Sequence, residues 1–261
     1  MTNFDYEEKV WGGNEVRLVP TYLSYLRLKY TLSDLAKVKG RILDAGCGGG
    51  GFAKAISMYR PDLAVYGVDI SRKAVSHAKG SNKGVAFKVG DVYALPFADN
   101  FFDAVIVEDV FEHLQKPYEA LDELSRVVKH GGILSAFIPL EGSVFSLHYW
   151  FSKLGWKSKR ELAGHIQGFK EKDVNLKIKE KGFKLEKKRY GAHLLGQIVD
   201  VGFFTVVDLV GRRLETGIEQ HLENKKVLTF FKNTITRLTN FESQILYFVP
   251  GAGIHIKAVK K

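Results

Sequence analysis

The chain has 261 residues, of which 45% are apolar and 26% charged, and its formal net charge is +10. This length and apolar content allow a full core and exclude a disordered chain. From the length we expect one domain over residues 1–261. The single cysteine, Cys47, excludes an internal disulfide, so we expect a reducing, cytoplasmic setting. The first twenty residues lack the pattern of a signal peptide, and no later stretch has the roughly 18 uncharged residues of a membrane span.

The positive charge is concentrated in one part of the chain. Residues 150–190 carry a net charge of +8, whereas residues 1–149 carry −1 and residues 191–261 carry +3. An excess of lysine and arginine in one segment is typical of a surface that meets an acidic substrate, a nucleic acid or an anionic membrane.

Residues 1–40 precede the first predicted strand, and we interpret them as a helical cap over the ligand pocket. The run from Val19 to Tyr30 predicts a helix with Leu23, Leu26 and Tyr30 on one face. Residues 11–13, Trp-Gly-Gly, predict a surface turn anchored by its tryptophan, with a lid over bound ligand as the alternative.

The segment from Arg41 to Ser57 reads as a short apolar strand, a glycine turn and an amphipathic helix. Asp44 lies at the end of the strand, and residues 46–51 form the turn. Glycines let a ligand approach the backbone at a helix N-terminus. The same spacing satisfies the G-x-G-x-x-G pattern of nicotinamide and flavin enzymes, so the turn alone leaves the cofactor open.

Further strands and helices alternate after this turn. The second strand ends at Asp69, a third runs from Val85 to Val89 before Gly90-Asp91-Val92, and a fourth runs from Phe102 to Val107 before Glu108. A helix from Tyr118 to Val128, the turn His130-Gly131-Gly132 and a strand from Ile133 to Ile138 follow. Such alternation predicts a parallel sheet that binds its ligand at the carboxyl ends of the strands.

The motifs LDAGCGGG, GVDIS, GDVYALPFADNFFDAVIVEDVFEHL and KHGGIL make residues 40–140 resemble class I S-adenosylmethionine-dependent methyltransferases. Within that class the chain is similar to the type 11-like group, which includes the ubiquinone and menaquinone biosynthesis methyltransferases. The resemblance implies an α/β, Rossmann-like fold with a seven-stranded, mostly parallel sheet and helices on both faces. Its last strand would be antiparallel, and residues 191–250 would form a helical insertion between strands six and seven. Residues 41–139 would then form the cofactor-binding core and residues 140–170 the substrate side.

The resemblance also implies the cofactor S-adenosylmethionine, with S-adenosylhomocysteine as the product. The residues implied for its methionine moiety are Asp44, Gly46, Cys47, Gly48, Gly50 and Glu108, the residue for its ribose is Asp69, and those for its adenine are Ile70, Asp91 and Val92. The alternative for Asp69 and Asp91 is helix capping. His130 stands where the family usually has proline.

The chemistry of methyl transfer needs alignment above all, but an alcohol or phenol acceptor gains from a positioned base. His113 and His165 are the catalytic candidates and His148 is a third, with packing or capping as the alternative for each. The histidines are scattered along the sequence and cysteine pairs are missing, so we expect no metal site.

The acceptor side of the chain is rich in aromatic and basic residues. Tryptophans and lysines alternate after residue 144, and the predicted helix from Leu194 to Val210 has a polar stripe of only Gln197, Asp200, Thr205 and Asp208. Its wide apolar face predicts contact with the core, a second copy of the chain or a bilayer surface, where Trp150 and Trp156 would lie at the interface. A second amphipathic helix follows a charged linker around residues 215–226.

These patterns together favour methyl transfer to a small-molecule or lipid-like acceptor at O, C or N. Two alternatives stay open. One is a tRNA or rRNA methyltransferase that uses the basic segment 150–190, and the other is a non-catalytic cofactor-binding module.

Overall fold

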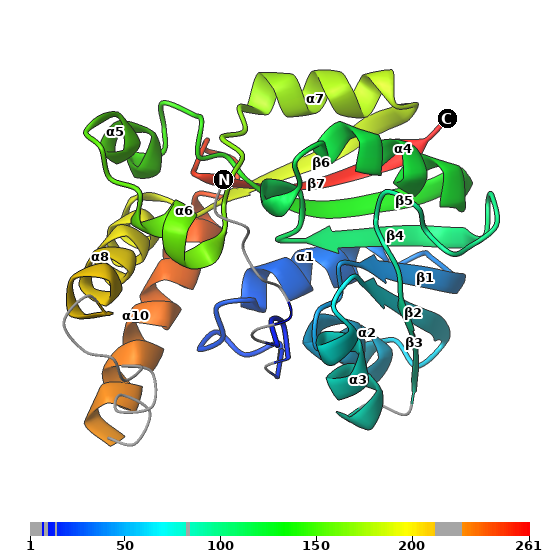
Figure 1. Cartoon of the computed structure of the whole chain (residues 1–261), viewed down its shortest axis with the longest axis horizontal. Helices are drawn as coiled ribbons and strands as arrows, with labels where there is room; N and C mark the ends of the chain where they lie inside the picture. The colour runs from blue at the N-terminus through cyan, green and yellow to red at the C-terminus, as the bar shows by residue number, and fades with distance from the viewer. Residues whose placement is uncertain (1–6, 8–9, 14, 82–83, 212–225) are drawn as a thin grey trace.

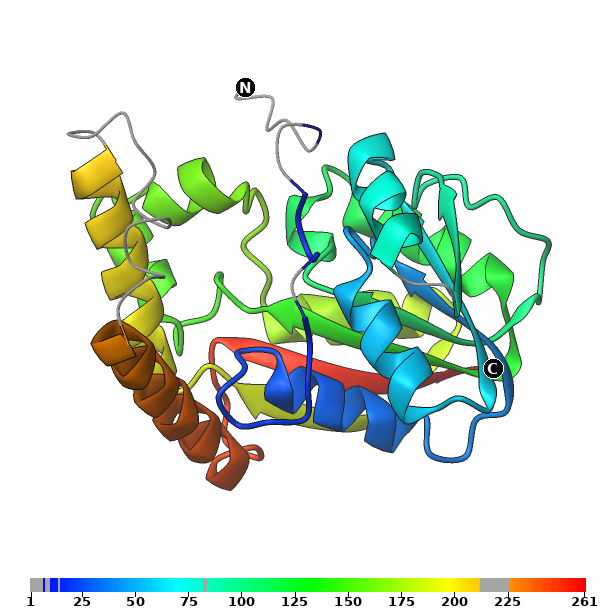
Figure 2. The same ribbon diagram turned by 90° about the horizontal axis from the view of Figure 1, so that it is seen from below.

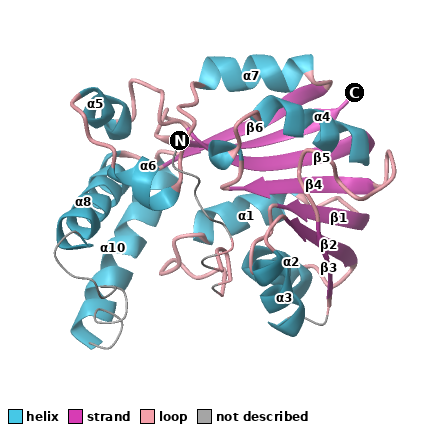
Figure 3. Ribbon diagram, in the orientation of Figure 1, coloured by secondary structure: helices cyan, strands magenta, loops and turns pink. Residues whose placement is uncertain are grey.

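The computed structural model describes residues 7, 10–13, 15–81, 84–211 and 226–261. A seven-stranded sheet with the order β3-β2-β1-β4-β5-β7-β6 forms its centre, and helices cover both faces (Figure 1 and Figure 3). The strands are β1 (Gly40–Ala45), β2 (Leu63–Asp69), β3 (Val85–Val89), β4 (Phe102–Glu108), β5 (Val128–Pro139), β6 (Phe183–Gly191) and β7 (Gly253–Lys260).

Strands β1 to β5 pair in parallel, and β7 pairs antiparallel with both β5 and β6. The predicted class of fold, with its antiparallel last strand, is confirmed. Its helical insertion is also confirmed, because α8 (Leu194–Gly211) and α10 (Lys226–Ile245) lie between β6 and β7.

Each face of the sheet has its own apolar core. One face is covered by α1 (Tyr25–Asp34), α2 (Gly51–Tyr59) and α3 (Arg72–Ser81), and the other by α4 (Pro117–Val127) and α7 (Glu171–Glu180) (Figure 1). Successive side chains of a strand point to opposite faces. Ile42 of β1 therefore packs in the first core while its neighbour Leu43 packs in the second.

The order of the strands reverses direction between β1 and β4. The chain leaves β1 for α2 on one face, whereas it leaves β4 for the short helix η1 (Phe111–His113) and then α4 on the opposite face. Diverging connections leave a crevice at the carboxyl ends of such strands, which is where ligands bind in this architecture.

Two local predictions are wrong. The first helix begins only at Tyr25, since residues before it form turns around Pro20, and Leu23 is 71% exposed while Leu26 and Leu28 are buried. In addition, residues 130–132 are not a turn that precedes the fifth strand. They form a bulge inside β5, where Phe102 pairs with Val128 but Ala104 pairs with Ile133.

Helices at the end of the sheet complete the fold. After β5 the chain forms α5 (Leu147–Lys153) and α6 (Ser158–Ala163), which pack against α8, and α10 packs beside α8 (Figure 2). Nearly all of the predicted linker 215–226 lies outside the described residues. Among the described helices, none has the length and apolar character needed to cross a membrane.

A buried ionic cluster joins α1 to the three strands at one edge of the sheet. Asp34 accepts hydrogen bonds from Arg189 of β6 (2.8 Å), His255 of β7 (2.9 Å) and Ser135 of β5 (3.1 Å). Burial alone would raise the pKa of Asp34, but the hydrogen bonds from His255 and Arg189 lower it. The cluster therefore holds an ionised carboxylate whose burial is compensated only while its partners stay in place.

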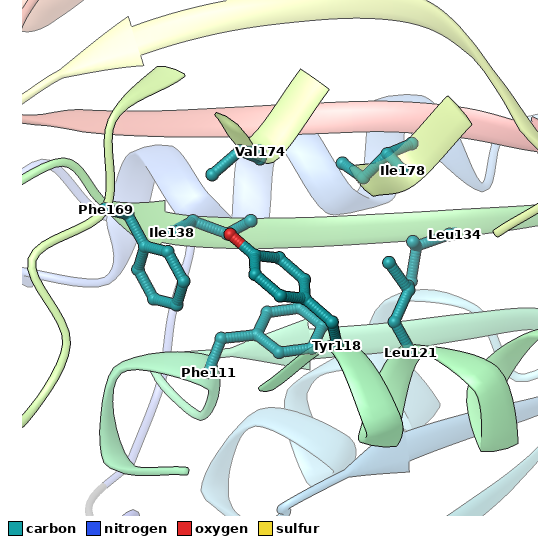
Figure 4. Close-up of a pocket in the computed structure, with 8 residues that line it drawn as sticks. All are labelled: Phe111, Tyr118, Leu121, Leu134, Ile138, Phe169, Val174 and Ile178. Carbon is teal, nitrogen blue, oxygen red and sulfur yellow. The ribbon is translucent and has the colours of Figure 1, made fainter. Parts of the chain in front are cut away.

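A small apolar cavity of about 10 Å³ lies between α4, α7 and β5 (Figure 4). Its lining consists of Phe111, Tyr118, Leu121, Leu134, Ile138, Phe169, Val174 and Ile178. A water molecule needs at least this volume and several polar partners. The cavity is thus a gap in the core rather than a ligand site.

The Asp34 cluster gives a testable prediction for stability. Arg189→Met leaves a buried carboxylate without its cation and should lower the free energy of unfolding by about 3–5 kcal/mol at pH 7, as measured by denaturant titration. The double variant Asp34→Asn/Arg189→Met should recover part of this loss. The control is Lys181→Met, which breaks the solvent-exposed pair with Asp122 and should cost less than about 1 kcal/mol. Equal losses for Arg189→Met and Lys181→Met would contradict the role of the cluster.

Candidate functional site

The glycine turn after β1 has a backbone conformation and close contacts that leave no room for side chains at several positions. Gly46, Gly48 and Gly50 have φ angles of 79°, 51° and 83°, values that glycine adopts without strain. A Cβ atom on Gly46 would lie 2.4 Å from Val110, and one on Gly48 would lie 2.4 Å from the carbonyl oxygen of Trp11. Cys47 between them is buried, and burial raises the pKa of its thiol, so it contributes a neutral side chain.

Asp69 holds this turn to the end of β2. Its Oδ2 accepts the backbone N–H of Gly48 (2.7 Å), and its Oδ1 accepts that of Ser71 (2.9 Å) at the start of α3. Burial raises the pKa of Asp69 despite these hydrogen bonds. Asp69 therefore holds two loops together at the edge of the crevice, and each carboxylate oxygen keeps capacity for a further hydrogen bond.

Two more acidic residues lie buried at the carboxyl ends of the neighbouring strands β1 and β4. Asp44 is 2% exposed, and its Oδ2 has no hydrogen-bond partner. Burial and the charge of Asp69 raise the pKa of Asp44 to about 7. Glu108 accepts a hydrogen bond from Thr31 (3.1 Å) on one oxygen only, and burial raises its pKa to about 8. Both side chains are thus disposed to accept a positively charged group.

The residue after Glu108 shows local backbone strain. Asp109 has a φ of 54° and forms an ion pair with Arg27 of α1. A positive φ at a residue other than glycine is uncommon, and residues strained in this way cluster at functional sites.

The predicted adenine residues lie at the ends of β2 and β3, which are adjacent strands. Ile70 is 58% exposed directly after Asp69, and the backbone N–H of Gly90 donates to the Asp69 carbonyl (3.0 Å). Asp91 uses Oδ1 to accept the N–H of Tyr93 (2.9 Å), while Val92 packs partly against the core. The helix-capping alternative is wrong for Asp91, because residues 90–101 are described and contain no helix, and α3 is capped by Ser71, whose hydroxyl accepts the N–H of Ala74 (3.0 Å).

An N-terminal strap, of which the structure describes residues 7 and 10–13, lies against the glycine turn. The carbonyl oxygens of Trp11 and Gly12 accept the N–H groups of Gly49 (2.6 Å) and Gly51 (2.9 Å). Glu7 accepts the N–H groups of Arg72 and Lys73 at the start of α3. The predicted turn at Trp11–Gly13 is present. It covers the glycine turn after β1, which the sequence analysis predicted to bind the cofactor. No pattern in the sequence indicates these contacts of Glu7.

A second cluster lies where η1 follows β4. The ring centroids of His113 and His165 are 5.0 Å apart, and the Nε2 atom of each lies 4.0 Å from Oε1 of Glu112. His165 faces Oε1 of Glu141 with its Nδ1 (2.8 Å), and His113 faces the carbonyl oxygen of Gly164 with its Nδ1 (3.2 Å). The fold thus brings together two histidines that lie far apart in the sequence, which removes the reason for expecting no metal site.

Burial dominates the electrostatics of this cluster. Glu112 is fully buried, and burial raises its pKa to about 8. Burial and the neighbouring His165 lower the pKa of His113 to about 4, so its imidazole is neutral at pH 7. Burial alone would raise the pKa of Glu141, but the hydrogen bond from His165 and the charge of Lys159 lower it to about 2. The cluster therefore contains one firmly ionised carboxylate beside two histidines.

His148 takes no part in that cluster. Its Nε2 pairs with Asp200 of α8 (2.7 Å), and its ring lies 5.2 Å from that of Trp156. Lys159 links the two groups, since Nζ contacts both Glu141 (2.9 Å) and Asp200 (2.8 Å). Sequence reasoning missed Glu112, Glu141 and Lys159. Glu112 could have been found as the sequence neighbour of His113. No pattern in the sequence indicates a functional role for Glu141 or Lys159.

The polar stripe of α8 faces inward. Gln197 is buried, and Asp200, Thr205 and Asp208 bond to side chains of α5, α6 and the loop between them. The apolar side chains of α8 and α10 face outward instead. Those that are at least 50% exposed are Leu194, Ile198, Phe203, Val206, Leu209, Phe230, Phe231, Leu238, Phe241 and Ile245. Packing within the described chain thus leaves this apolar face uncovered, and we call it the α8–α10 face.

Comparison with known proteins gives a family and relatives of stated activity. Residues 43–136 match the family described as "Methyltransferase domain". The chain is 38% identical over 124 residues to an uncharacterized methyltransferase of Schizosaccharomyces pombe, covering 43% of each chain. It is 34% identical over 139 residues to the ubiquinone biosynthesis O-methyltransferase of Alkalilimnicola ehrlichii, covering 51% of this chain and 56% of that one. The matched part spans about half the length of these curated relatives.

Among solved structures, the chain resembles phosphoethanolamine N-methyltransferase 2 of Haemonchus contortus in complex with S-adenosyl-L-methionine, with a TM-score of 0.54. The two are 20% identical, and the alignment covers 90% of this chain and 52% of that one. At this identity the likeness establishes the fold. Residues 43–136 of this chain thus match a methyltransferase domain, and its seven-stranded sheet with the antiparallel β7 has the fold of that solved methyltransferase.

Proposed function

We propose that the chain is an S-adenosylmethionine-dependent methyltransferase that acts on a small-molecule or lipid-like acceptor and releases S-adenosylhomocysteine. The observation that carries this proposal is the pair of buried acids Asp44 and Glu108, each with an unpartnered oxygen, beside the glycine turn. The cofactor brings an ammonium and a sulfonium group, and such cations satisfy buried carboxylates. The methyltransferase family match supports the same reading.

The proposed cofactor contacts follow the ends of successive strands. The turn at Gly46, Cys47, Gly48 and Gly50 would lie beneath the methionine moiety, with Asp44 and Glu108 on its positive groups. Asp69 would accept the ribose hydroxyls, and Ile70, Asp91 and Val92 would surround the adenine. The N–H groups of Gly49 and Gly51 are already bonded to the N-terminal strap. The turn would therefore contact the cofactor through close approach of its backbone, and the strap would act as a lid.

Methyl transfer requires a nucleophile in line with the methyl group and, for a hydroxyl acceptor, a place for its proton. We assign that place to His113 and His165, which lie at the carboxyl end of β4 beyond Glu108. Glu141 orients His165 through its hydrogen bond at Nδ1.

A lipid-like acceptor is favoured by the α8–α10 face. Because the polar stripe of α8 faces inward, we expect the apolar face to meet a bilayer surface, with a second copy of the chain as the alternative. Exposed Lys153, Lys157 and Arg160 lie on the adjoining α5 and α6, where they would meet anionic head groups. Trp150 is 52% exposed and suits an interfacial position. Trp156 instead donates a hydrogen bond to Thr205 (3.1 Å) and holds α8 in place. We propose a cytoplasmic protein that contacts membranes peripherally.

The RNA alternative is less well supported because many basic residues of 150–190 have acidic partners. Lys159 is bound between Glu141 and Asp200, Arg189 is buried on Asp34, and Lys181 and Lys188 pair with Asp122 and Glu171. A nucleic-acid groove needs unpaired cations that follow the phosphates. The non-catalytic alternative is tested by incubating the protein with labelled cofactor and with lipid, quinone-precursor or RNA extracts. Labelling of any extract would exclude it.

Cofactor choice gives the first prediction of this section. S-adenosylhomocysteine should raise the melting temperature, since ligands of the native state stabilise it, and NAD should not. Asp69→Asn should weaken binding of S-adenosylhomocysteine by roughly 10- to 100-fold in calorimetry, because ribose hydroxyls lose a charged acceptor. Asp62→Ala removes an exposed carboxylate at the other end of β2 and should bind normally. Equal stabilisation by both ligands would refute the assignment.

Proton release gives the next prediction. At pH 7 in the free protein, Asp44, with a pKa of about 7, is about half protonated, and Glu108, with a pKa of about 8, is largely protonated. A bound cation lowers the pKa of a neighbouring carboxyl, so S-adenosylmethionine binding at pH 7 should release about one proton. Calorimetry in buffers of different ionisation enthalpy measures this number. Release should fall toward zero at pH 9, where both groups are already ionised, and Asp44→Asn should reduce it. An enthalpy independent of the buffer would contradict the proposed placement of the cofactor.

Membrane contact is tested by co-sedimentation with liposomes. The wild type should pellet with vesicles that contain anionic lipid, less at high salt. Phe230→Glu/Phe241→Glu places two charges on the α8–α10 face and should abolish binding. The control is Leu176→Glu, which places a charge on an exposed leucine of α7 and should leave binding unchanged. A wild type that stays in the supernatant, together with a dimer that this double variant dissociates, would assign the face to a second copy of the chain.

A further inference from the structure

Three potential metal ligands converge at the start of η1. Glu112 and His113 come from η1 itself, and His165 comes from the loop after α6. One carboxylate oxygen of Glu112 and one ring nitrogen from each histidine all lie within 4.8 Å of one another. Ligand atoms around a four-coordinate ion at about 2 Å lie about 3.3 Å apart, so shifts of roughly 1 Å would close the site.

The hydrogen bonds behind both histidines match those of metal ligands. Nδ1 of His165 faces the Glu141 carboxylate, and Nδ1 of His113 faces the carbonyl oxygen of Gly164. Both partners are acceptors, which assigns the proton to Nδ1 and leaves the lone pair on Nε2 directed toward Glu112. A carboxylate or carbonyl behind the imidazole is the usual means of orienting a ligating histidine.

The loop that carries His165 is fixed to η1 by its backbone. The N–H groups of Ile166 (2.9 Å) and Gln167 (3.2 Å) both donate to the carbonyl oxygen of Glu112. The side chain of Gln167 donates to the carbonyl oxygen of Leu114 (2.7 Å). The two elements thus hold their side chains together without any ligand.

The carboxylate of Glu112 lacks partners in this arrangement. The side chain is fully buried, and neither oxygen has a hydrogen bond. Buried polar groups without partners are rare in folded proteins and call for an explanation. Near it, Glu141 and Asp200 share the single cation Lys159 and so carry a formal charge of −1, which ionisation of Glu112 on metal binding would raise to −2. A divalent cation would balance that charge.

We propose that Glu112, His113 and His165 bind a divalent transition-metal ion. Two imidazoles and one carboxylate suit Zn²⁺, Fe²⁺, Mn²⁺ or Co²⁺, whereas Mg²⁺ and Ca²⁺ prefer sites made entirely of oxygen. Three protein ligands leave a coordination position open. If the proposed methyl transfer holds, an acceptor hydroxyl can occupy that position, where the cation would lower its pKa so that its proton leaves to solvent. The histidines would then hold the cation instead of accepting the proton themselves.

The test is calorimetric titration of chelator-treated, full-length protein with ZnCl₂, and with MgCl₂ as the negative control. The wild type should bind one Zn²⁺ per chain. Glu112→Gln and His165→Gln should bind at least about 100-fold more weakly, and Glu141→Gln, which removes only the group behind His165, about 10- to 100-fold. His77→Gln removes an exposed histidine of α3 and should bind as the wild type does. Circular dichroism establishes that each variant is folded.

Titration of the same samples with S-adenosylhomocysteine separates this proposal from the proposed function. Loss of Zn²⁺ binding with unchanged affinity for S-adenosylhomocysteine is the expected result for His165→Gln. Zn²⁺ binding that is absent in the wild type, or equal in the wild type and in both ligand variants, would overturn the metal site whatever the cofactor does. Failure of S-adenosylhomocysteine to bind while Zn²⁺ binding follows the expected pattern would overturn the proposed function alone.

Discussion

The structure depends on the reversal of strand order between β1 and β4. Two parallel strands lie side by side there, yet the chain leaves them toward opposite faces of the sheet. The connections that follow these two strands therefore leave the carboxyl ends uncovered, and other segments of the chain have to cover them. In this molecule those segments are the N-terminal strap, α1 and the loop after α6. Every functional candidate described above therefore lies on elements whose position follows from this one reversal.

The consequence of that geometry is an edge where acids accumulate without their counterions. Asp44, Glu108 and Glu112 are all buried at or just beyond the ends of β1 and β4, and each retains at least one unpartnered oxygen. The Asp34 cluster shows how the same chain treats a carboxylate with a purely structural role, because it provides Arg189, His255 and Ser135 around it. Carboxylates left without such partners are better understood as binding groups, and the charge they select for is positive.

The sequence predicted the sheet and the glycine turn after β1 well because both rest on local patterns. Apolar strands of fixed spacing, glycines with positive φ and acids at strand ends are visible in the chain itself, and Asp44, Gly48 and Asp69 follow from them. The β5 bulge was missed because a glycine pair predicts a turn as readily as a bulge. The extra turns before α1 were missed because the apolar period continues through Leu23 although the helix does not.

What the sequence could not provide is proximity between distant segments. His113 and His165 were candidates separately, but their contact with Glu112 and the support from Glu141 depend on where the loop after α6 folds back. For α8 the sequence correctly indicated a wide apolar face and a narrow polar stripe. It did not indicate which of the two faces the rest of the protein. A helix with four polar residues usually turns them to solvent. Here Lys159, His148 and Trp156 provide better partners, and the apolar side faces outward.

The position of β7 constrains how the chain can be made. Among the described strands, β6 is paired only with β7, and residues 192–252 separate the two in the sequence. During synthesis at about 5–20 residues per second, the edge of β5 and the whole of β6 wait several seconds for a partner. Unpaired strand edges recruit other chains. Asp34 waits as well, since His255 is on β7. The nascent chain thus passes through an interval in which its cofactor half can be folded while its other half exposes edges that chaperones would need to protect.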